Sequence, residues 1–297
     1  MILLTGSSGF LGQQILSTIN RDNIKTLSRQ QQSDFVTDLV STVPELDLRI
    51  TTVIHCAGQA HIVPKTVGQK QRFYGVNVQG TRNLIKGLEQ CKTLPKAFVF
   101  ISSVSVYGVE SGNLIDEAAP ILAKDPYGES KIQAENLIQQ WCSKNNVICT
   151  ILRLPLLAGP NPPGNLRSMI KGIKSGYYFN IAEGKAKKSM VLAEDVAKII
   201  PIVADIGGIY NLTDRYHPTF YELSEIIAQQ LGKSNSKNIP KWTADIMAQI
   251  GDLIGSKAPI NSKKLNKITS DLTFDDSKAV AAFGWNPTPV LKGFKIK

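Results

Sequence analysis

Tyr127 and Lys131 are the residues with the clearest chemical potential in this sequence. They stand four positions apart, so on a helix their side chains share one face, one turn from each other. A free tyrosine has a pKa near ~10 and holds its proton too tightly to act as a base at neutral pH. A neighbouring ammonium together with a second positive charge favours the phenolate, and lowering the pKa by about three units requires roughly 4 kcal/mol. The pair predicts proton transfer to or from the oxygen of a carbinol or ketone.

Three glycines near the amino terminus, Gly6, Gly9 and Gly12, follow an apolar run and open a helical pattern. Gly6 permits a tight turn, Gly9 lets the backbone approach a pyrophosphate, and Gly12 allows close helix–strand packing. The helix amino terminus then receives negative charge. This segment, which includes Phe10 and Leu11, predicts a dinucleotide site. An oxidised nicotinamide would supply the second positive charge beside the tyrosine.

The end of the second expected strand indicates which dinucleotide is bound. About 20 residues after the glycines, an NAD enzyme usually places an acidic residue on the ribose hydroxyls. Here Ser28 and Arg29 occupy that place, and a guanidinium can instead bind a 2′-phosphate. We therefore favour NADP(H) over NAD(H), while a solvated strand-end charge remains the alternative for Arg29.

Apolar runs alternate with helical patterns through the first half of the chain, which predicts an α/β fold with a doubly wound parallel sheet of the Rossmann type. The expected strands are Met1–Thr5, Ile24–Ser28, Thr52–Cys56, Ala97–Ser102 and Ile148–Leu152, and the expected helices are Gly12–Asn20, Lys70–Gln90 and Tyr127–Asn145.

A length of 297 residues is at the upper limit for a single core. We expect an NAD(P)-binding Rossmann domain over residues 1–155 and a smaller substrate-binding lobe over 156–297. The lobe begins where the rhythm loosens into Pro/Gly-rich turns at 159–164, and some of its segments are expected to return to the sheet.

The composition indicates the class of protein, its location and the partners it is expected to have. An apolar content of 42% suits a soluble enzyme, no stretch is long enough to span a bilayer, and the opening residues read as a buried strand rather than a signal peptide. The net charge of +10 lacks the interleaved aromatic residues of a nucleic-acid platform, although attraction to an acidic membrane surface stays open. The three histidines show no metal-ligand spacing, so no metal is expected. Four cysteines without paired spacing indicate reduced thiols in a cytoplasm: Cys56, Cys91, Cys142 and Cys149.

Beyond the Tyr127/Lys131 pair and the glycine segment, the sequence resembles an extended short-chain dehydrogenase/reductase of the NAD-dependent epimerase/dehydratase family over essentially its whole length. The residues that carry the resemblance are Thr5–Gly12, Asp38-Leu39, His55–Gly58, Asn77–Thr81, Ser102–Gly108, Tyr127–Lys131, Arg153–Pro155 and Gly284-Trp285.

The resemblance implies a role for several further residues. Ser103 would hydrogen-bond the reacting oxygen, Tyr127 would be the acid/base, and Lys131 would bind the nicotinamide ribose while tuning the tyrosine. Asp38 and Leu39 would flank the adenine.

Four more positions would support the cofactor in such an enzyme. Ala57 and Gly58 would line it, and the backbone near Pro155 would meet the carboxamide. Asn77 would support the helix that carries the lysine, through its backbone and a water. A polar group inside a helix is the plainer interpretation of Asn77.

The resemblance assigns the substrate-binding residues in less detail. Asn165, Leu166 and Lys188 fall where the family holds the base and diphosphate of a nucleotide sugar, although lysine lacks the bidentate fork of the arginine that many members carry. His61 is expected to face the sugar or simply to be a packed or exposed histidine. Ser105, beside Ser103, is also assigned to the substrate.

One departure from the family pattern bears on the reaction. The nucleotide-sugar dehydratases of the family carry an Asp-Glu pair directly after the position of Ser103, whereas this sequence has Val104 and Ser105, so dehydration loses its carboxylates.

The tail 267–275 and the segment 60–63 resemble a bacterial surface-polysaccharide branch with UDP-N-acetylhexosamine 4-ketoreductases and proteins labelled 4-epimerases. Our first expectation is an NADP(H)-dependent reductase of a UDP-linked 4-keto sugar, and the nearest alternative is a 4-epimerase with tightly bound NAD. A non-catalytic NADP-binding sensor is the third interpretation, and a homodimer through helices 70–90 and 127–145 is expected.

Overall fold

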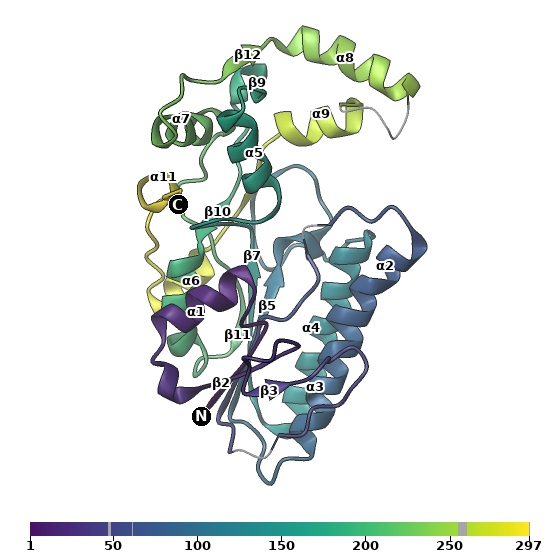
Figure 1. Cartoon of the computed structure of the whole chain (residues 1–297), viewed down its shortest axis with the longest axis vertical. Coiled ribbons are helices and arrows are strands. Elements are labelled where there is room, and N and C mark those ends of the chain that lie inside the picture. The colour runs from purple at the N-terminus through teal and green to yellow at the C-terminus, as the bar shows by residue number, and fades with distance from the viewer. Residues whose placement is uncertain (47–48, 61, 255–259, 297) are drawn as a thin grey trace.

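The computed structural model describes residues 1–46, 49–60, 62–254 and 260–296 and shows an α/β fold. Seven parallel strands form a central sheet with helices on both faces, and a second group of short strands and helices sits at one end of it (Figure 1).

The strands of the central sheet are β1 (Ile2–Thr5), β2 (Ile24–Ser28), β3 (Phe35–Val36), β4 (Thr52–His55), β5 (Ala97–Ser103), β7 (Ile148–Leu154) and β11 (Gly208–Asn211). The helices around it are α1 (Phe10–Thr18), α2 (Val67–Tyr74), α3 (Gly80–Glu89), α4 (Pro126–Asn145), α6 (Ala193–Val203) and α10 (Ser277–Phe283). The short strands elsewhere are β6 (Gly112–Ile115), β8 (Leu156–Ala158), β9 (Phe179–Ile181), β10 (Met190–Leu192), β12 (Lys237–Ile239) and β13 (Leu272–Phe274). The remaining helices are α5 (Gly164–Lys174), α7 (Phe220–Gln230), α8 (Lys241–Ile254), α9 (Ser262–Thr269) and α11 (Val290–Gly293).

The strand order of the central sheet is β11-β7-β5-β4-β1-β2-β3. The chain therefore winds outward from β1 in one direction through β2 and β3, and in the other through β4, β5, β7 and β11. The order reverses between β1 and β4, and a crevice at the carboxyl ends of these strands is where such sheets bind ligands. The doubly wound sheet expected from the sequence is confirmed.

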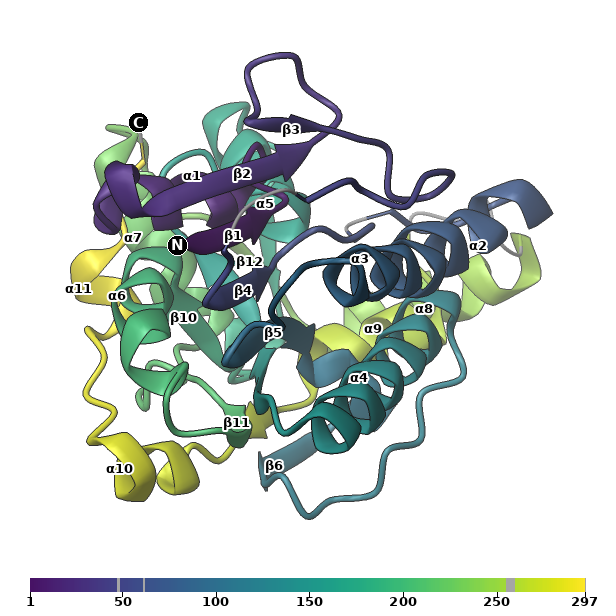
Figure 2. The same ribbon diagram turned by 90° about the horizontal axis from the view of Figure 1, so that it is seen from below.

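Neighbouring residues in each strand point to opposite faces of this sheet, as the two-residue strand period requires. Leu4, Ile54 and Val99 pack beneath α1 and α6. The preceding residues Leu3, Val53 and Phe98 pack on the other face, beneath α3 and α4. Because both faces are covered, these strands read as continuous apolar runs in the sequence. Figure 2 shows the two helix layers on either side of the strands.

Several expected boundaries need correction. The first helix runs over Phe10–Thr18 rather than Gly12–Asn20, the third strand stops at His55, and the fourth continues to Ser103. The strand expected over Ile148–Leu152 continues to Leu154, and the helix expected over Tyr127–Asn145 begins one residue earlier, because Asp125 caps it and Pro126 takes its first position.

The single helix expected over Lys70–Gln90 is three elements. α2 starts at Val67 because Thr66 and Gln69 form a capping box. A π turn over Gly75–Gln79 follows, and α3 continues from Gly80 to Glu89. Such turns interrupt an α-helix where a side chain must be re-aimed, frequently at functional sites.

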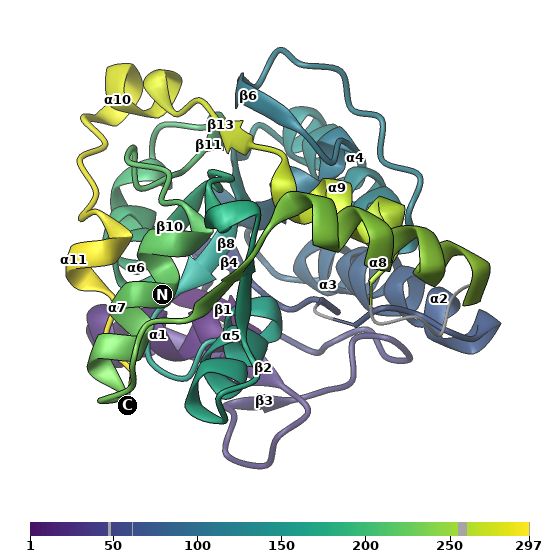
Figure 3. The ribbon, with the colours of Figure 1, turned by 90° about the horizontal axis from the view of Figure 1, so that it is seen from above.

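The rest of the chain forms a lobe of three two-stranded parallel pairs with helices around them. β8 pairs with β10, β9 with β12, and β6 with β13, so residues far apart in the sequence meet in each pair. Seen from above, α8 lies across the far end of this lobe with α9 beside it (Figure 3). Strand β11 belongs to the central sheet although it follows β10 in the chain.

Candidate active site

A cavity of about 520 Å³ opens where the strand order reverses. Eight residues that the sequence assigned to the cofactor line it: Gly6, Gly9, Ser28, Arg29, Asp38, Leu39, Ala57 and Gly58. Sequence reasoning missed nine others: Ser8, Leu27, Gln30, Thr37, Val40, Cys56, Gln59, Arg72 and Val76. Most of these adjoin a residue that was named, so their signal was proximity to a motif. Arg72 on α2 had no such signal.

Two positions of the glycine loop, Gly6 and Gly12, have no room for a side chain. Gly6 has φ +71°, and a Cβ there would lie 2.6 Å from the amide nitrogen of Ala57. A Cβ on Gly12 would overlap the carbonyl oxygen of Gly6. The first turn of α1 is thereby held against the loop, with its amino terminus directed at the cavity rim that Gly9 lines. This cradle and cavity fit the diphosphate of a dinucleotide. Phe10 and Leu11 stand in that first turn, where Leu11 is buried in the core.

The residue directly after β2 is an arginine and not an acidic residue. Arg29 is exposed at the cavity, and Ser28 Oγ accepts from the amide of Gln30. The nearest acid, Asp34, accepts from the amide and hydroxyl of Thr26 and pairs with Lys25 at 2.9 Å. Although burial raises the pKa of Asp34, these hydrogen bonds and the ammonium lower it to about 2. This carboxylate therefore serves the fold of the β2–β3 loop.

The three residues proposed for catalysis come from β5 and α4. Ser103 ends β5, where its Oγ donates to Ser105 Oγ at 3.1 Å and accepts from the Ser105 amide. Tyr127 lies in the first turn of α4, packed against Phe73. Lys131 follows one turn later, with its Nζ donating to the Ile101 carbonyl at 2.6 Å.

Burial shifts the pKa values of Tyr127 and Lys131 in opposite directions. Burial raises the pKa of Tyr127, an effect that the approach of Ser103 only partly offsets. Burial lowers the pKa of Lys131 to about 8, against the opposing charge of Glu135. The expected lowering of the Tyr127 pKa includes the charge of a bound nicotinamide, so it stays a prediction for the cofactor-bound site. The ammonium is held by the Ile101 carbonyl and the Phe100 ring, 3.9 Å away.

A buried polar chain holds the cofactor loop in place. Thr5 Oγ1 accepts from the Ala57 amide at 3.1 Å and lies 2.6 Å from His55 Nδ1. His55 Nε2 lies 2.9 Å from Thr81 Oγ1, which donates to the Asn77 carbonyl. Since Thr81 uses its proton there, it accepts from Nε2, and we assign His55 as the neutral Nε2–H tautomer. Burial, with the charge of Lys131, lowers the pKa of His55 to about 3, which agrees with a neutral ring.

Asn77 sits in the π turn and joins two parts of the site. Its Oδ1 accepts from the Gln59 amide at 2.7 Å, and its Nδ2 donates to Ser130 Oγ on α4 at 2.8 Å. The link to the helix that carries Lys131 is thus made directly by the side chain, which the sequence did not indicate.

An ion pair beneath α4, the helix that carries Tyr127 and Lys131, was also not predicted from the sequence. Arg153 Nη2 and Glu135 Oε2 lie 2.8 Å apart, and both side chains are only 2% exposed. Ser102 donates to Glu135, and Tyr107 Oη accepts from Arg153 at 3.2 Å. A charge pair between α4 and β7 has no local spacing signal, so only the fold brings it together.

The residues proposed for the substrate are less uniform. Asn165 is exposed on α5, whereas Leu166 is buried in the core of the lobe, leaving only its backbone for a ligand. Lys188 Nζ donates to the carbonyls of Lys267 and Ser270 at the carboxyl end of α9. Ser105 adjoins Ser103. Pro155, proposed for the cofactor carboxamide, lies between β7 and β8, and His61 falls outside the described residues.

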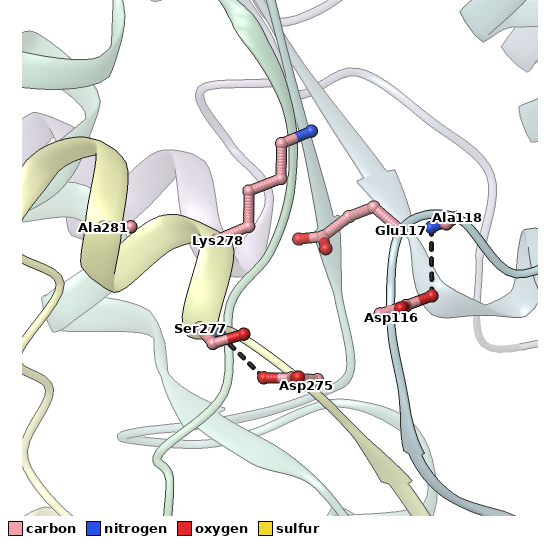
Figure 4. A pocket seen from close by; sticks show the side chains of 7 residues that line it. All are labelled: Asp116, Glu117, Ala118, Asp275, Ser277, Lys278 and Ala281. Atoms are coloured by element: carbon pink, nitrogen blue, oxygen red, sulfur yellow. Dashed lines mark hydrogen bonds between the residues drawn. The ribbon is translucent and has the colours of Figure 1, made fainter.

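A second hollow, of about 630 Å³, lies beside the first turn of α10 (Figure 4). Its acidic residues serve local turns: Asp116 accepts from the Ala118 amide, and Asp275 from the Ser277 amide. Glu117, which faces Lys278 in the figure, accepts from the Asn211 amide. No residue proposed for the reaction lines it. Across the described residues, no group of His, Cys, Asp and Glu is arranged to hold a metal ion.

The fold and this site define an NAD(P)-dependent enzyme. The family model for the NAD dependent epimerase/dehydratase family matches residues 2–212, and the chain belongs to this family. In the part of the chain that the structure describes, no helix is long and apolar enough to cross a membrane.

Two relatives match nearly the whole chain. The N-acetyl-alpha-D-glucosaminyl-diphospho-ditrans,octacis-undecaprenol 4-epimerase of Escherichia coli O157:H7 is 30% identical, over 93% of this chain and 88% of the relative. The UDP-glucose 4-epimerase of Vibrio cholerae is 28% identical, over 99% of this chain and 93% of the relative. Among solved structures, RMD from Pseudomonas aeruginosa complexed with NADPH superimposes with a TM-score of 0.70 at 21% identity, over 98% and 95% of the two chains. This last likeness is one of fold.

Proposed function

We propose that the protein is an NADP(H)-dependent reductase of a 4-keto hexosamine linked to a nucleotide diphosphate, UDP in the first instance. The observation that carries the choice of cofactor is the rim of the cavity at the end of β2. Arg29 lies there, while Asp34, the nearest acid after β2, is occupied by Thr26 and Lys25. The other charged residues that line the cavity are Asp38 and Arg72, the latter on α2. A guanidinium directly after β2 favours a 2′-phosphate over bare ribose hydroxyls.

The chain's own residues supply the acid–base part of this reaction. The nicotinamide, when bound, supplies the hydride. Tyr127 donates its phenolic proton to the oxygen at C4 of the sugar, and the Ser103 hydroxyl hydrogen-bonds and orients the same oxygen. Lys131 would supply positive charge beside Tyr127, which stabilises the phenolate that remains after proton transfer. For this its ammonium would turn from the Ile101 carbonyl toward the ribose.

Elimination of water is disfavoured by the residues that follow Ser103. Val104 and Ser105 form the start of a 3₁₀ turn after β5, and neither can act as a carboxylic acid or a carboxylate base. The intact serine, tyrosine and lysine likewise favour a catalyst over a sensor.

A 4-epimerase is the second candidate, and the two relatives named above favour it. Both are named as 4-epimerases, and in each name the sugar is joined to a diphosphate carrier or nucleotide. Epimerisation at C4 would use the same Ser103, Tyr127 and Lys131, with the cofactor reoxidised in each turnover. We further propose a homodimer through α4 and the segment 70–90, which spans α2 and α3, and a cytoplasmic location.

The test is the identity and exchange of the cofactor. Purified protein is denatured, and the released nicotinamide is identified; dissociation constants for NADPH and NADH are then measured for the wild type, Arg29→Ala and Ser28→Asp. A charge-assisted hydrogen bond contributes about 1.5–3 kcal/mol, so Arg29→Ala should weaken NADPH by roughly one to two decades and NADH much less. Ser28→Asp should turn the preference toward NADH, because a carboxylate binds ribose hydroxyls and repels a 2′-phosphate.

Exchangeable NADPH together with consumption of a UDP-4-keto-hexosamine supports the reductase. Tightly held NAD, or equal losses for both cofactors in Arg29→Ala, contradicts the NADP assignment and puts the epimerase first.

A further inference from the structure

One helix of the substrate lobe carries a wide apolar face that the rest of the described chain leaves exposed. The large side chains of α8 are exposed by 67% at Trp242, 50% at Ile246, 52% at Ile250 and 90% at Leu253. At 100° per residue these four positions fall within about 80° of each other around the helix axis. Met247 and Ile254, also exposed, widen the same face.

The opposite face of α8 already has its partner. Ala244 and Ala248 are buried against Leu265 of α9. Asp252 accepts from the amide of Ser262 at 3.1 Å, which ties the end of α8 to the start of α9. The exposed side chains are therefore not turned toward a core of this chain. In Figure 1, α8 is the outermost element of the lobe and α9 lies beneath it, on the side of the central sheet.

The segment that carries this face is strongly basic. Residues 231–270 contain seven lysines and two aspartates, a net charge of +5, which is half of the +10 of the whole chain in about one seventh of its length. Lys233, Lys237 and Lys241 lead into α8 and are exposed. An apolar helix face bearing tryptophan, within a lysine-rich segment, has the composition of helices that lie in the interface of an anionic bilayer.

We propose that α8 docks the protein on an anionic lipid bilayer, with Trp242, Ile246, Ile250 and Leu253 entering the interface and the neighbouring lysines contacting the headgroups. A second copy of the chain is the less suitable occupant. A two-fold contact through this face would bring the same lysine-rich segment of both copies together, and like charges oppose such a contact. A bilayer of anionic lipids offers both the apolar depth and the opposite charge. Docking does not depend on which sugar reaction the active site performs.

The experiment is co-sedimentation of the full-length protein with vesicles of phosphatidylglycerol and phosphatidylcholine, or of phosphatidylcholine alone. The chain offers a matched pair of variants. Ile250→Glu on α8 and Ile202→Glu on α6 replace the same residue, exposed by 52% and 53%, with the same charge. Circular dichroism and NADPH binding verify that both variants are folded.

We expect the wild type to bind the phosphatidylglycerol vesicles and to bind phosphatidylcholine alone far more weakly. Ile250→Glu should lower the partition coefficient at least about tenfold, since burying a charge and losing an apolar side chain both oppose insertion, whereas Ile202→Glu should change it by about twofold or less. Raising the salt from about 0.1 M to 1 M should weaken binding, because the screening length falls from ~10 Å to ~3 Å.

Three results would overturn the proposal. One is an equal effect of the two variants on vesicle binding, and another is no binding by the wild type. The third is that Ile250→Glu changes the oligomeric state in analytical ultracentrifugation and leaves vesicle binding intact, which would assign the face to a second copy of the chain.

Discussion

Two regions of the molecule are held by different kinds of polar contact. Beside the glycine loop, side chains bond side chains in a buried chain, as with Thr5, His55 and Thr81. At the last segment of the chain, single carboxylates bind backbone amides: Asp195 of α6 accepts from Thr288, and Asp214, which follows β11, accepts from Val290. A side-chain network fixes the positions of several side chains and of the loop that they hold, whereas a bond to a backbone amide fixes only the path of the chain. The region beside the proposed cofactor site is therefore the more precisely held of the two.

The largest effect is expected where this precision serves chemistry. Tyr127→Phe keeps the packing on Phe73 but removes the proton donor, so turnover should fall by about 10²–10⁴. Steady-state rates with a UDP-4-keto sugar, beside NADPH binding by fluorescence, measure the two properties separately. Near-normal turnover in this variant would refute the role given to Tyr127; a comparable loss of NADPH affinity would make the residue a cofactor ligand instead.

The next effect tests the buried network itself. Glu135→Leu leaves the Arg153 guanidinium without its partner and should lower the free energy of unfolding by about 3–5 kcal/mol. Replacing both, in Glu135→Leu/Arg153→Met, should recover much of the loss, because no unpaired charge is then buried. Urea unfolding of the three proteins provides the comparison. A double variant as unstable as the single would mean that contacts to Ser102 and Tyr107, rather than charge pairing, dominate.

The smallest effect concerns the lobe. Burial, with the charge of Lys267, lowers the pKa of Lys188 to about 8, whereas an unfolded lysine titrates near ~10.4. Between these values the unfolded chain binds more protons, so the stability that Lys188 contributes should rise with pH. Because the side chain is only half-buried, the gain over Lys188→Met should be at most about 1 kcal/mol between pH 8 and 10. A constant difference between the two proteins across this range, in urea unfolding, would show that Lys188 keeps an ordinary pKa.

The amino-terminal half of the chain, which forms the proposed cofactor site, was also the half that the sequence predicted better. Its strands are buried on both faces and read as apolar runs, and Gly6 and Gly12 stand where any side chain would collide with backbone. These requirements are local, so they leave a signal in the sequence. The family resemblance then located Ser103, Tyr127 and Lys131 on β5 and α4, although their roles stay predictions.

What the sequence missed depends on contacts between distant segments. Asn77 lies in a π turn and bonds Gln59 and Ser130, and no periodicity in the sequence predicts that turn. The Lys188 ammonium binds carbonyls at the end of α9, and a separation of some 80 residues along the chain does not indicate that contact. Leu166 was chosen by position in the family pattern, and its burial shows that a position carries no information about which way a side chain faces.

The place of β11 has a consequence for the synthesis of the protein on the ribosome. β7 is complete at Leu154, yet its outer neighbour β11 begins only at Gly208. While the intervening residues are being translated, the nascent chain presents an unpaired apolar strand edge, which invites pairing with other chains. At translation rates of about 5–20 residues per second the exposure lasts several seconds. We therefore expect chains truncated between these strands to aggregate, and chaperone engagement to peak in the same interval of elongation.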